Sequence, residues 1–104
     1  MILFVDDEKL PQQFGLDAKT PHARTAAQAL EMIEKEGFDE LYLDHDLGEG
    51  WTGHELLKIL VERGTKIKKV TFISLNVVGI GNMIELCRDN NIPYDRKLLA
   101  SDAF

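Results

Sequence analysis

The sequence predicts a three-layer α/β domain with a mostly parallel five-stranded sheet, in a single domain that spans residues 1–104. Short apolar runs alternate along the chain with segments that have the periodicity of amphipathic helices. The apolar runs are continuous, which is typical of strands buried on both faces of a parallel sheet. With 104 residues, 44% of them apolar and 29% charged, the chain can form one modest core.

Three strong strands are predicted, and each is an apolar run that ends in polar residues. They are "ILFVDD" (Ile2 to Asp7), "ELYLDHD" (Glu40 to Asp46) and "VTFISLN" (Val70 to Asn76). Two weaker strands are expected around His22 to Arg24 and Tyr94 to Leu98.

Three helices are predicted between these strands. Each of the first two begins with a capping-box pattern, a threonine followed three residues later by Gln or Glu, and ends at a glycine. The pairs are Thr25 with Gln28 and Thr52 with Glu55, and the glycines are Gly37 and Gly64. The third helix is indicated by apolar residues spaced as one helical face, and it ends near Asn90. These residues are Ile80, Met83, Ile84 and Cys87.

One face of the predicted sheet has little to cover it. Residues 8–21 contain two prolines and Gly15, with at most a short helical turn in "LPQQFG", and "LLASDAF" leaves no room for a closing helix. Either short segments with Phe14 or Phe104 cover this face, or a second subunit does. We therefore predict a homodimer.

Composition excludes several classes of protein. The formal net charge of −6 argues against non-specific binding of nucleic acid, which depends on basic residues that neutralise phosphates. The first apolar run lacks a basic flank and meets "DDE" after five residues, so we expect neither a signal peptide nor a membrane span, and a cytoplasmic location. The single cysteine, Cys87, rules out an intrachain disulfide and is expected to be buried. A small phosphate-containing ligand stays possible only with a metal ion or clustered donors to offset the acidic background.

Four aspartates follow the first and third strands and are expected to meet at the carboxyl edge of the sheet. They are Asp6, Asp7, Asp44 and Asp46. Carboxylates held this close resist ionisation unless a cation compensates them, and hard oxygen ligands suit Mg²⁺ or Mn²⁺. The sequence therefore predicts a metal site there. The alternative is that these acids are solvated strand ends.

Three nearby side chains have open roles. His45 could transfer a proton beside a metal-bound phosphate. Period-two alternation, however, points it away from Asp44 and Asp46, so a structural role below the site is an equal alternative. His54 falls in the first turn of a helix, close to the same edge, where it could bind substrate or simply be exposed. Trp51 could form a wall over the site or pack on its own loop.

The segment "SLNVVGIGNM" (Ser74 to Met83) suits a bound phosphate. Ser74 and Asn76 offer side-chain donors, Gly79 and Gly81 allow tight turns, and a helix N-terminus presents free N–H groups. An ordinary strand-to-helix loop would look similar.

A basic residue near the fifth strand could complete the site. The ammonium group of Lys97 could reach the edge and neutralise a phosphoryl oxygen, with Arg96 as the alternative.

These motifs together resemble the receiver domain of two-component response regulators, with its flavodoxin-like fold. The resemblance implies that Asp6 and Asp7 are Mg²⁺ ligands, that Asp44 is the phospho-acceptor and that Asp46 binds metal through its backbone. It likewise implies that Ser74 is the switch hydroxyl and that Lys97 is the phosphate-pairing lysine. Compared with a receiver domain, the first and last helices are expected to be reduced or missing.

The motifs "LFVDDE", "LDHDLGEGWTG" and "SLNVVGIGNM" are more similar to a divergent branch, the cyclic-phosphate-processing receiver-like family. That resemblance implies a metal-dependent phosphoesterase acting on cyclic nucleotides or RNA 2′,3′-cyclic ends. This chain departs from the family pattern at Ile73, where a histidine is usual, and at Val77, where a proline is usual. Four alternatives are therefore open. They are a weakened enzyme, an enzyme that depends on His45 or His54, a phospho-accepting switch, and a non-catalytic binder of a cyclic nucleotide or a partner protein.

Overall fold

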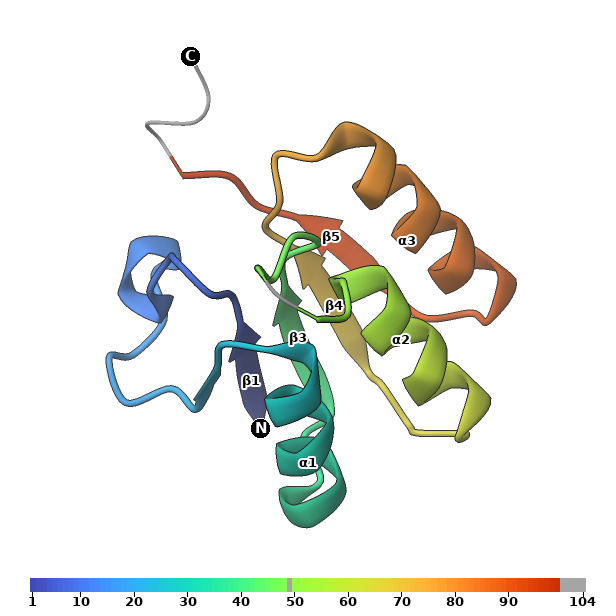
Figure 1. Ribbon diagram of the computed structural model, residues 1–104, viewed down its shortest axis with the longest axis horizontal. Helices are drawn as coiled ribbons and strands as arrows, with labels where there is room; N and C mark the ends of the chain where they lie inside the picture. The colour runs from blue at the N-terminus through green and yellow to red at the C-terminus, as the bar shows by residue number, and fades with distance from the viewer. Residues whose placement is uncertain (49, 100–104) are drawn as a thin grey trace.

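The computed structural model describes residues 1–48 and 50–99, which form five strands, three α-helices and one 3-10 helix (Figure 1). In chain order the elements are β1 (Ile2–Val5), η1 (Pro11–Phe14), β2 (His22–Ala23), α1 (Ala26–Glu36), β3 (Glu40–Leu43), α2 (Gly53–Glu62), β4 (Lys69–Phe72), α3 (Val77–Asp89) and β5 (Tyr94–Arg96). All five predicted strands and all three predicted helices are present. The strands stop earlier than predicted, so the polar residues after each apolar run lie in loops.

The sheet has the order β2-β1-β3-β4-β5, and all its neighbouring strands are parallel. Val5, Leu43 and Phe72, the last residues of β1, β3 and β4, lie side by side in register. The residue after β3 is tied to β1, because the Asp44 backbone N–H donates to the Val5 carbonyl at 3.0 Å. The loops after these three strands therefore begin at the same level of the carboxyl edge.

Side-chain caps set the start of each α-helix. Thr25 accepts from the Gln28 backbone N–H at the start of α1, and Thr52 and Glu55 form a reciprocal capping box at the start of α2. Asn76 caps α3 by accepting from the Gly79 N–H at 2.9 Å.

The prediction that Gly79 and Gly81 form tight turns is wrong. Both lie inside α3, which begins at Val77 because the Asn76 cap satisfies its first turn.

The three α-helices cover one face of the sheet. Side chains from α1, α2 and α3 pack with alternate residues of the central strands in one core cluster that includes Leu3, Leu41, Val70 and, as predicted, the buried Cys87. None of the helices formed by residues 1–48 and 50–99 is long and apolar enough to span a membrane.

The other face carries a thin layer. There Phe4, Phe14 and Ile73 form a second buried cluster, with Leu16 and Leu99 against it. The first helix of the fold is thus reduced to η1, and Phe14 covers this face as one prediction had it. Phe104 lies outside the described residues, and the homodimer stays a prediction.

Candidate functional site

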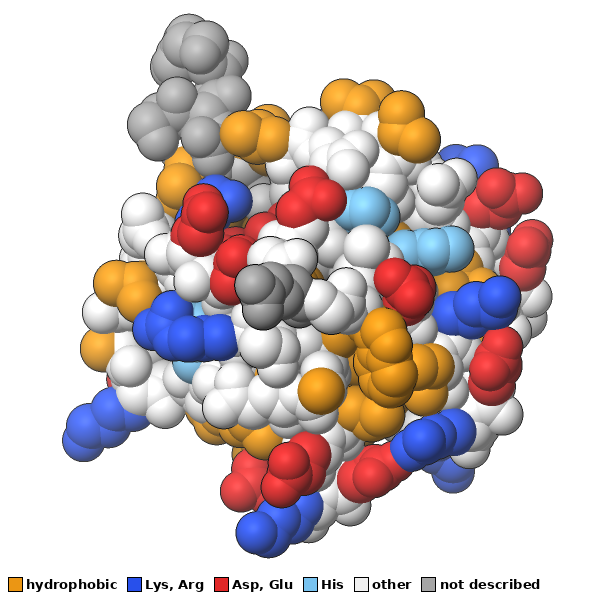
Figure 2. All heavy atoms as spheres, viewed as in Figure 1, with side chains coloured by type: hydrophobic (Ala, Val, Ile, Leu, Met, Phe, Trp, Pro, Cys, Tyr) orange, Lys and Arg blue, Asp and Glu red, His pale blue; other side chains and the backbone are white. Residues whose placement is uncertain are grey.

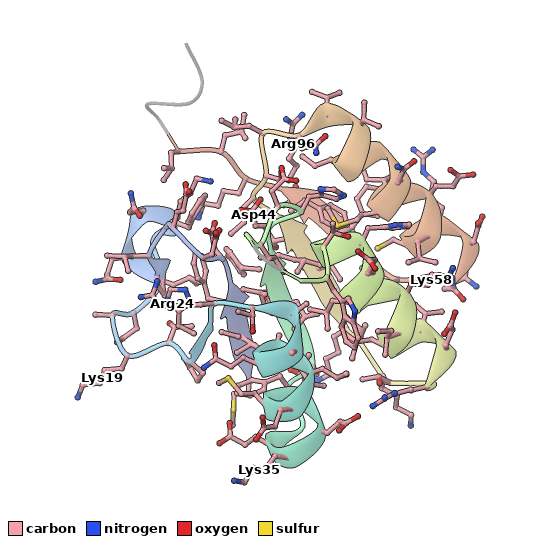
Figure 3. The ribbon with its side chains drawn as sticks, in the orientation of Figure 1. Lys19, Arg24, Lys35, Asp44, Lys58 and Arg96 are labelled. Atoms are coloured by element: carbon pink, nitrogen blue, oxygen red, sulfur yellow. The ribbon has the colours of Figure 1, made fainter. Side chains whose placement is uncertain are left out.

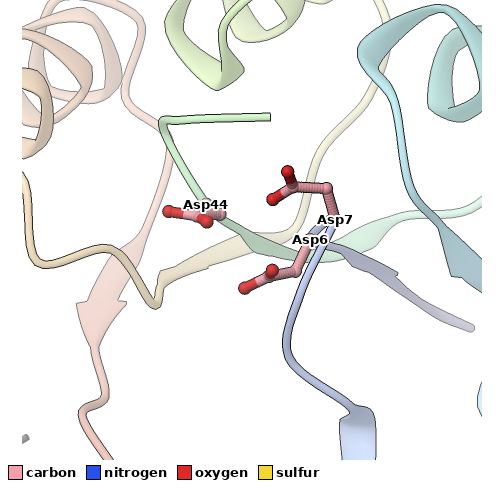
Figure 4. Close-up of side chains that lie close together, drawn as sticks. All are labelled: Asp6, Asp7 and Asp44. Atoms are coloured by element: carbon pink, nitrogen blue, oxygen red, sulfur yellow. The ribbon is translucent and has the colours of Figure 1, made fainter. Parts of the chain in front are cut away.

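Three carboxylates converge at the carboxyl edge of the sheet. Asp6 and Asp7 follow β1, Asp44 follows β3, and the register of these two strands brings them together (Figure 4). One oxygen from each lies within 4.8 Å of the others, an arrangement that could hold a metal ion. Figure 2 shows acidic side chains gathered on this part of the surface.

Asp6 is the most constrained of the three, with none of its surface exposed. Its Oδ1 accepts from the backbone N–H groups of Glu8 and Lys9 at 2.8 and 2.9 Å. Its Oδ2 has no hydrogen-bond partner, and the Lys9 ammonium nitrogen is 3.7 Å away. A buried carboxylate oxygen without a donor is costly, and a cation would satisfy it. The residues present therefore fit a divalent metal ion.

Asp44 is 7% exposed, and its side chain resists ionisation. Burial raises the pKa of Asp44 to about 6, and the negative charge of Asp6 adds to the increase. Lys9, the Ser74 hydroxyl and the His45 backbone N–H, which donates at 2.8 Å, act in the opposite direction. At neutral pH a nearby cation would stabilise the ionised form.

A polar cavity of about 310 Å³ adjoins these carboxylates. It is lined by Asp7, Asp44 and Asp46, together with Ser74 and Asn76 from the β4–α3 loop. A larger hollow of about 560 Å³ lies at the opposite edge of the sheet, among residues such as Gly64 and Ile67. We place the site at the smaller cavity, because the convergent carboxylates and donors are there.

The alternation-based prediction that His45 points away from Asp44 and Asp46 is wrong for Asp46. The strand ends at Leu43, so period-two alternation no longer applies at position 45. His45 Nδ1 lies 3.0 Å from Asp46 Oδ1 and 3.2 Å from Asn76 Nδ2. A Cβ on Gly79 would lie 2.5 Å from the His45 ring, so this glycine makes room for the imidazole.

Several predicted site residues lie elsewhere. The Lys97 ammonium group donates to the Phe14 carbonyl at 2.6 Å, and neither Lys97 nor Arg96 lines the cavity. His54 lies in a separate hollow between α2 and α3. Trp51 lies beside the start of α1, and it is 44% exposed.

Ile73, where the family pattern has histidine, is also away from the cavity. Its side chain is buried with Phe4 and Phe14 on the face opposite the α-helices.

Sequence reasoning missed four residues of the cavity wall, Glu8, Lys9, Gly48 and Leu75, and two of them shape the site. Lys9 lines the cavity two positions after Asp7, where a cation next to paired acids was the available signal. Gly48 has a φ of 72°, and a Cβ there would lie 2.9 Å from Asp7 Oδ2. A glycine is thus needed for this loop to approach Asp7, and no local pattern indicated that.

A parallel five-stranded sheet in this order, with a carboxylate cluster at its carboxyl edge, defines a receiver-like α/β domain. The chain belongs to the family described as the cyclic-phosphate processing receiver domain, whose model matches residues 1–89. Both the predicted fold class and the predicted family are thereby confirmed.

Solved receiver domains share the fold. The receiver domain of NtrX from Brucella abortus is 24% identical, with a TM-score of 0.68, and the match covers 99% of this chain and 90% of that one. A CheY-like receiver domain protein from Methanospirillum hungatei is 24% identical (TM-score 0.62, 92% and 79% covered). The N-terminal domain of a response regulator/sensory box/GGDEF protein from Carboxydothermus hydrogenoformans is 19% identical (TM-score 0.59, 93% and 78% covered). A comparison with curated protein sequences found no match.

Proposed function

We propose that this domain is a metal-dependent phosphoesterase that acts on a cyclic phosphate, either a cyclic nucleotide or an RNA 2′,3′-cyclic end. The observation that carries the proposal is the unpartnered, fully buried Asp6 Oδ2 within a group of three carboxylates. The description of the family supports the substrate class. The polar cavity beside the carboxylates offers room for a phosphate-containing ligand.

In this proposal Asp6, Asp7 and Asp44 hold Mg²⁺ or Mn²⁺. The bound metal ion would supply Lewis-acid polarisation of a phosphoryl oxygen and offset the negative charge of the site. The Ser74 hydroxyl accepts from the Asn76 N–H at 3.0 Å, so its own proton is free to be donated to a phosphoryl oxygen. The Asn76 amide is a second donor at the same wall.

His45 and Asp46 are the groups that could move a proton. The Nδ1 of His45 is 3.0 Å from an oxygen of the exposed Asp46, which can accept a hydrogen bond from an N–H at that atom. A proton held at this atom would lie at the wall formed by Asp46 and Asn76. The nucleophile is either water or the Asp44 carboxylate itself.

The test is turnover of a panel of cyclic mono- and dinucleotides and RNA 2′,3′-cyclic ends with Mg²⁺ or Mn²⁺. We expect metal-dependent product from the wild type, loss of product in Asp44→Asn, and retention in Asp89→Asn, an exposed acid at the end of α3. Absence of product from every substrate would overturn the proposal. Retention of a nucleotide without turnover would instead support the non-catalytic binder.

A phospho-accepting receiver domain is the second candidate, favoured by the position of Asp44 and the Ser74 hydroxyl in the wall of the same cavity. In that case acetyl phosphate and Mg²⁺ would give a stable phosphate on Asp44, with no turnover of cyclic phosphates. Mass spectrometry after incubation separates the two functions, because only the switch accumulates the phosphorylated chain.

A further inference from the structure

We infer that Lys9 is the cation that binds the ligand's phosphate group at this site, in place of the lysine near the fifth strand. The inference rests on the proposed function, because it assigns the residue that recognises the phosphate of that ligand. Lys9 lies outside the three sequence motifs, and its position in the structure assigns it to the site.

Lys9 is fixed at the mouth of the acidic cluster by its own backbone. Its N–H donates to Asp6 Oδ1 at 2.9 Å, so the turn after β1 returns the lysine toward the acids. Its side chain, 21% exposed, lines the same cavity as Asp44 and Ser74. The ammonium nitrogen is 3.7 Å from Asp6 Oδ2, which is too far for a hydrogen bond. Its N–H groups are therefore available to a phosphoryl oxygen in the cavity.

The other basic side chains at this edge are used elsewhere. Lys97 donates to the Phe14 carbonyl at 2.6 Å and would have to give up that hydrogen bond to enter the cavity. Arg24 contacts the Asp7 carbonyl at 3.4 Å from the exposed side and does not line the cavity. Among the basic residues of the described chain, only Lys9 lines it.

Charge balance gives Lys9 a defined task. Three ionised carboxylates exceed the charge of a divalent cation by one, and the remaining negative charge would repel a phosphate. One ammonium group at the cavity wall cancels the excess of these three carboxylates, and Glu8 and Asp46, which also line the cavity, make a cation there more necessary for binding a phosphate. Lys9 also competes with a metal ion for Asp6 Oδ2, because both are attracted to the same oxygen.

These two effects have opposite signs, which makes the inference testable with inorganic phosphate and Mn²⁺ as probes. At pH 8, we expect Lys9→Gln to weaken phosphate binding to the Mn²⁺-loaded protein by on the order of tenfold, the usual consequence of losing a hydrogen bond to a charged group. We expect the same variant to bind Mn²⁺ more tightly than the wild type. A purely structural role for Lys9 would weaken both. Isothermal titration calorimetry measures the two affinities.

The controls separate local from general effects. Lys9→Arg keeps the charge and should restore phosphate binding, whereas Lys19→Gln removes the same charge far from Asp44 (Figure 3) and should leave both affinities unchanged. Four results would each overturn the inference. They are an equal loss of phosphate affinity in Lys19→Gln, unchanged phosphate binding in Lys9→Gln, a loss of phosphate affinity confined to Lys97→Gln, and no phosphate binding by the wild type. A failure to turn over cyclic phosphates would not, because phosphate and Mn²⁺ binding are measured without catalysis.

Discussion

Replacing Asp44 by asparagine should stabilise the metal-free domain. The pKa of this carboxyl is about 6 in the folded chain against an ordinary value of 3.8. Each tenfold change in the acid dissociation constant corresponds to about 1.4 kcal/mol, so keeping Asp44 ionised costs about 3 kcal/mol of folding free energy. Asparagine has nearly the same shape, carries no charge, and can still accept from the His45 N–H. We expect Asp44→Asn to gain about 1–3 kcal/mol at pH 8 in EDTA.

The sign of this effect depends on pH. Between pH 4 and 6 the folded wild type holds a proton on Asp44 that the unfolded chain has lost, so the free energy of unfolding decreases as pH rises through this window. Below pH 4 the carboxyl is neutral in both states, and the gain from Asp44→Asn should vanish. Urea denaturation of both proteins at pH 3.5, 5 and 8 measures this difference. A variant less stable than the wild type at pH 8 in EDTA would refute the reasoning.

A metal ion should reverse the order of stability. A ligand that binds only the folded state stabilises it in proportion to the logarithm of its concentration above Kd. Mg²⁺ or Mn²⁺ should therefore raise the Tm of the wild type and raise that of Asp44→Asn much less, because a carboxylate of the cluster is gone. An equal increase in both proteins would mean that the ion binds elsewhere.

Three further predictions concern stability, each measured by urea denaturation. Gly79→Ala places a Cβ 2.5 Å from the His45 ring and should lower the free energy of unfolding by about 1–3 kcal/mol. Gly81→Ala in the same helix meets nothing within 4 Å and should raise it by about 0.5–1 kcal/mol. Similar effects of both substitutions would contradict the contact between Gly79 and His45. Thr52→Ala should cost about 1 kcal/mol by removing the cap of α2, and Thr52→Ser, which keeps the hydroxyl, should cost clearly less. Ile73→His should cost about 2 kcal/mol or more, because it buries an imidazole in an aromatic cluster; a neutral effect would show that position 73 can reach polar surroundings.

The sequence predicted the elements of the fold well because the local signals are strong. Continuous apolar runs specified β1, β3 and β4, and the threonine caps specified the starts of α1 and α2. The start of α3 was less clear, because Asn76 with Gly79 lacks the acidic or amide partner of a capping box and the two glycines suggested a turn. Local composition could not distinguish a helical glycine that admits a neighbouring ring from one that forms a turn.

The candidate site was predictable only in part. Asp6, Asp7 and Asp44 follow strands, and parallel register is enough to bring them together. The direction of a side chain beyond a strand end depends on the turn after that strand. His45 and Lys9 contact their near neighbours Asp46 and Asp6 after the strand has ended, where strand periodicity no longer gives the direction of a side chain. Lys97 contacts Phe14, which is far away in the sequence and could not be predicted from a local pattern.

The three carboxylates stay close together, at a cost in folding free energy, because packing fixes the strand ends from which they emerge. Val5, Leu43 and Phe72, the last residues of three adjacent strands, are fully buried, and they fix the backbone from which Asp6 and Asp44 emerge. These two carboxylates therefore stay buried and close together, and burial, with a further contribution from the charge of Asp6, raises the pKa of Asp44. A flexible loop carrying the same acids would let them separate into water and would lose affinity for a cation, since each would have to be brought back on binding. The same rigidity that lowers the stability of the metal-free chain thus preorganises the site for a divalent ion.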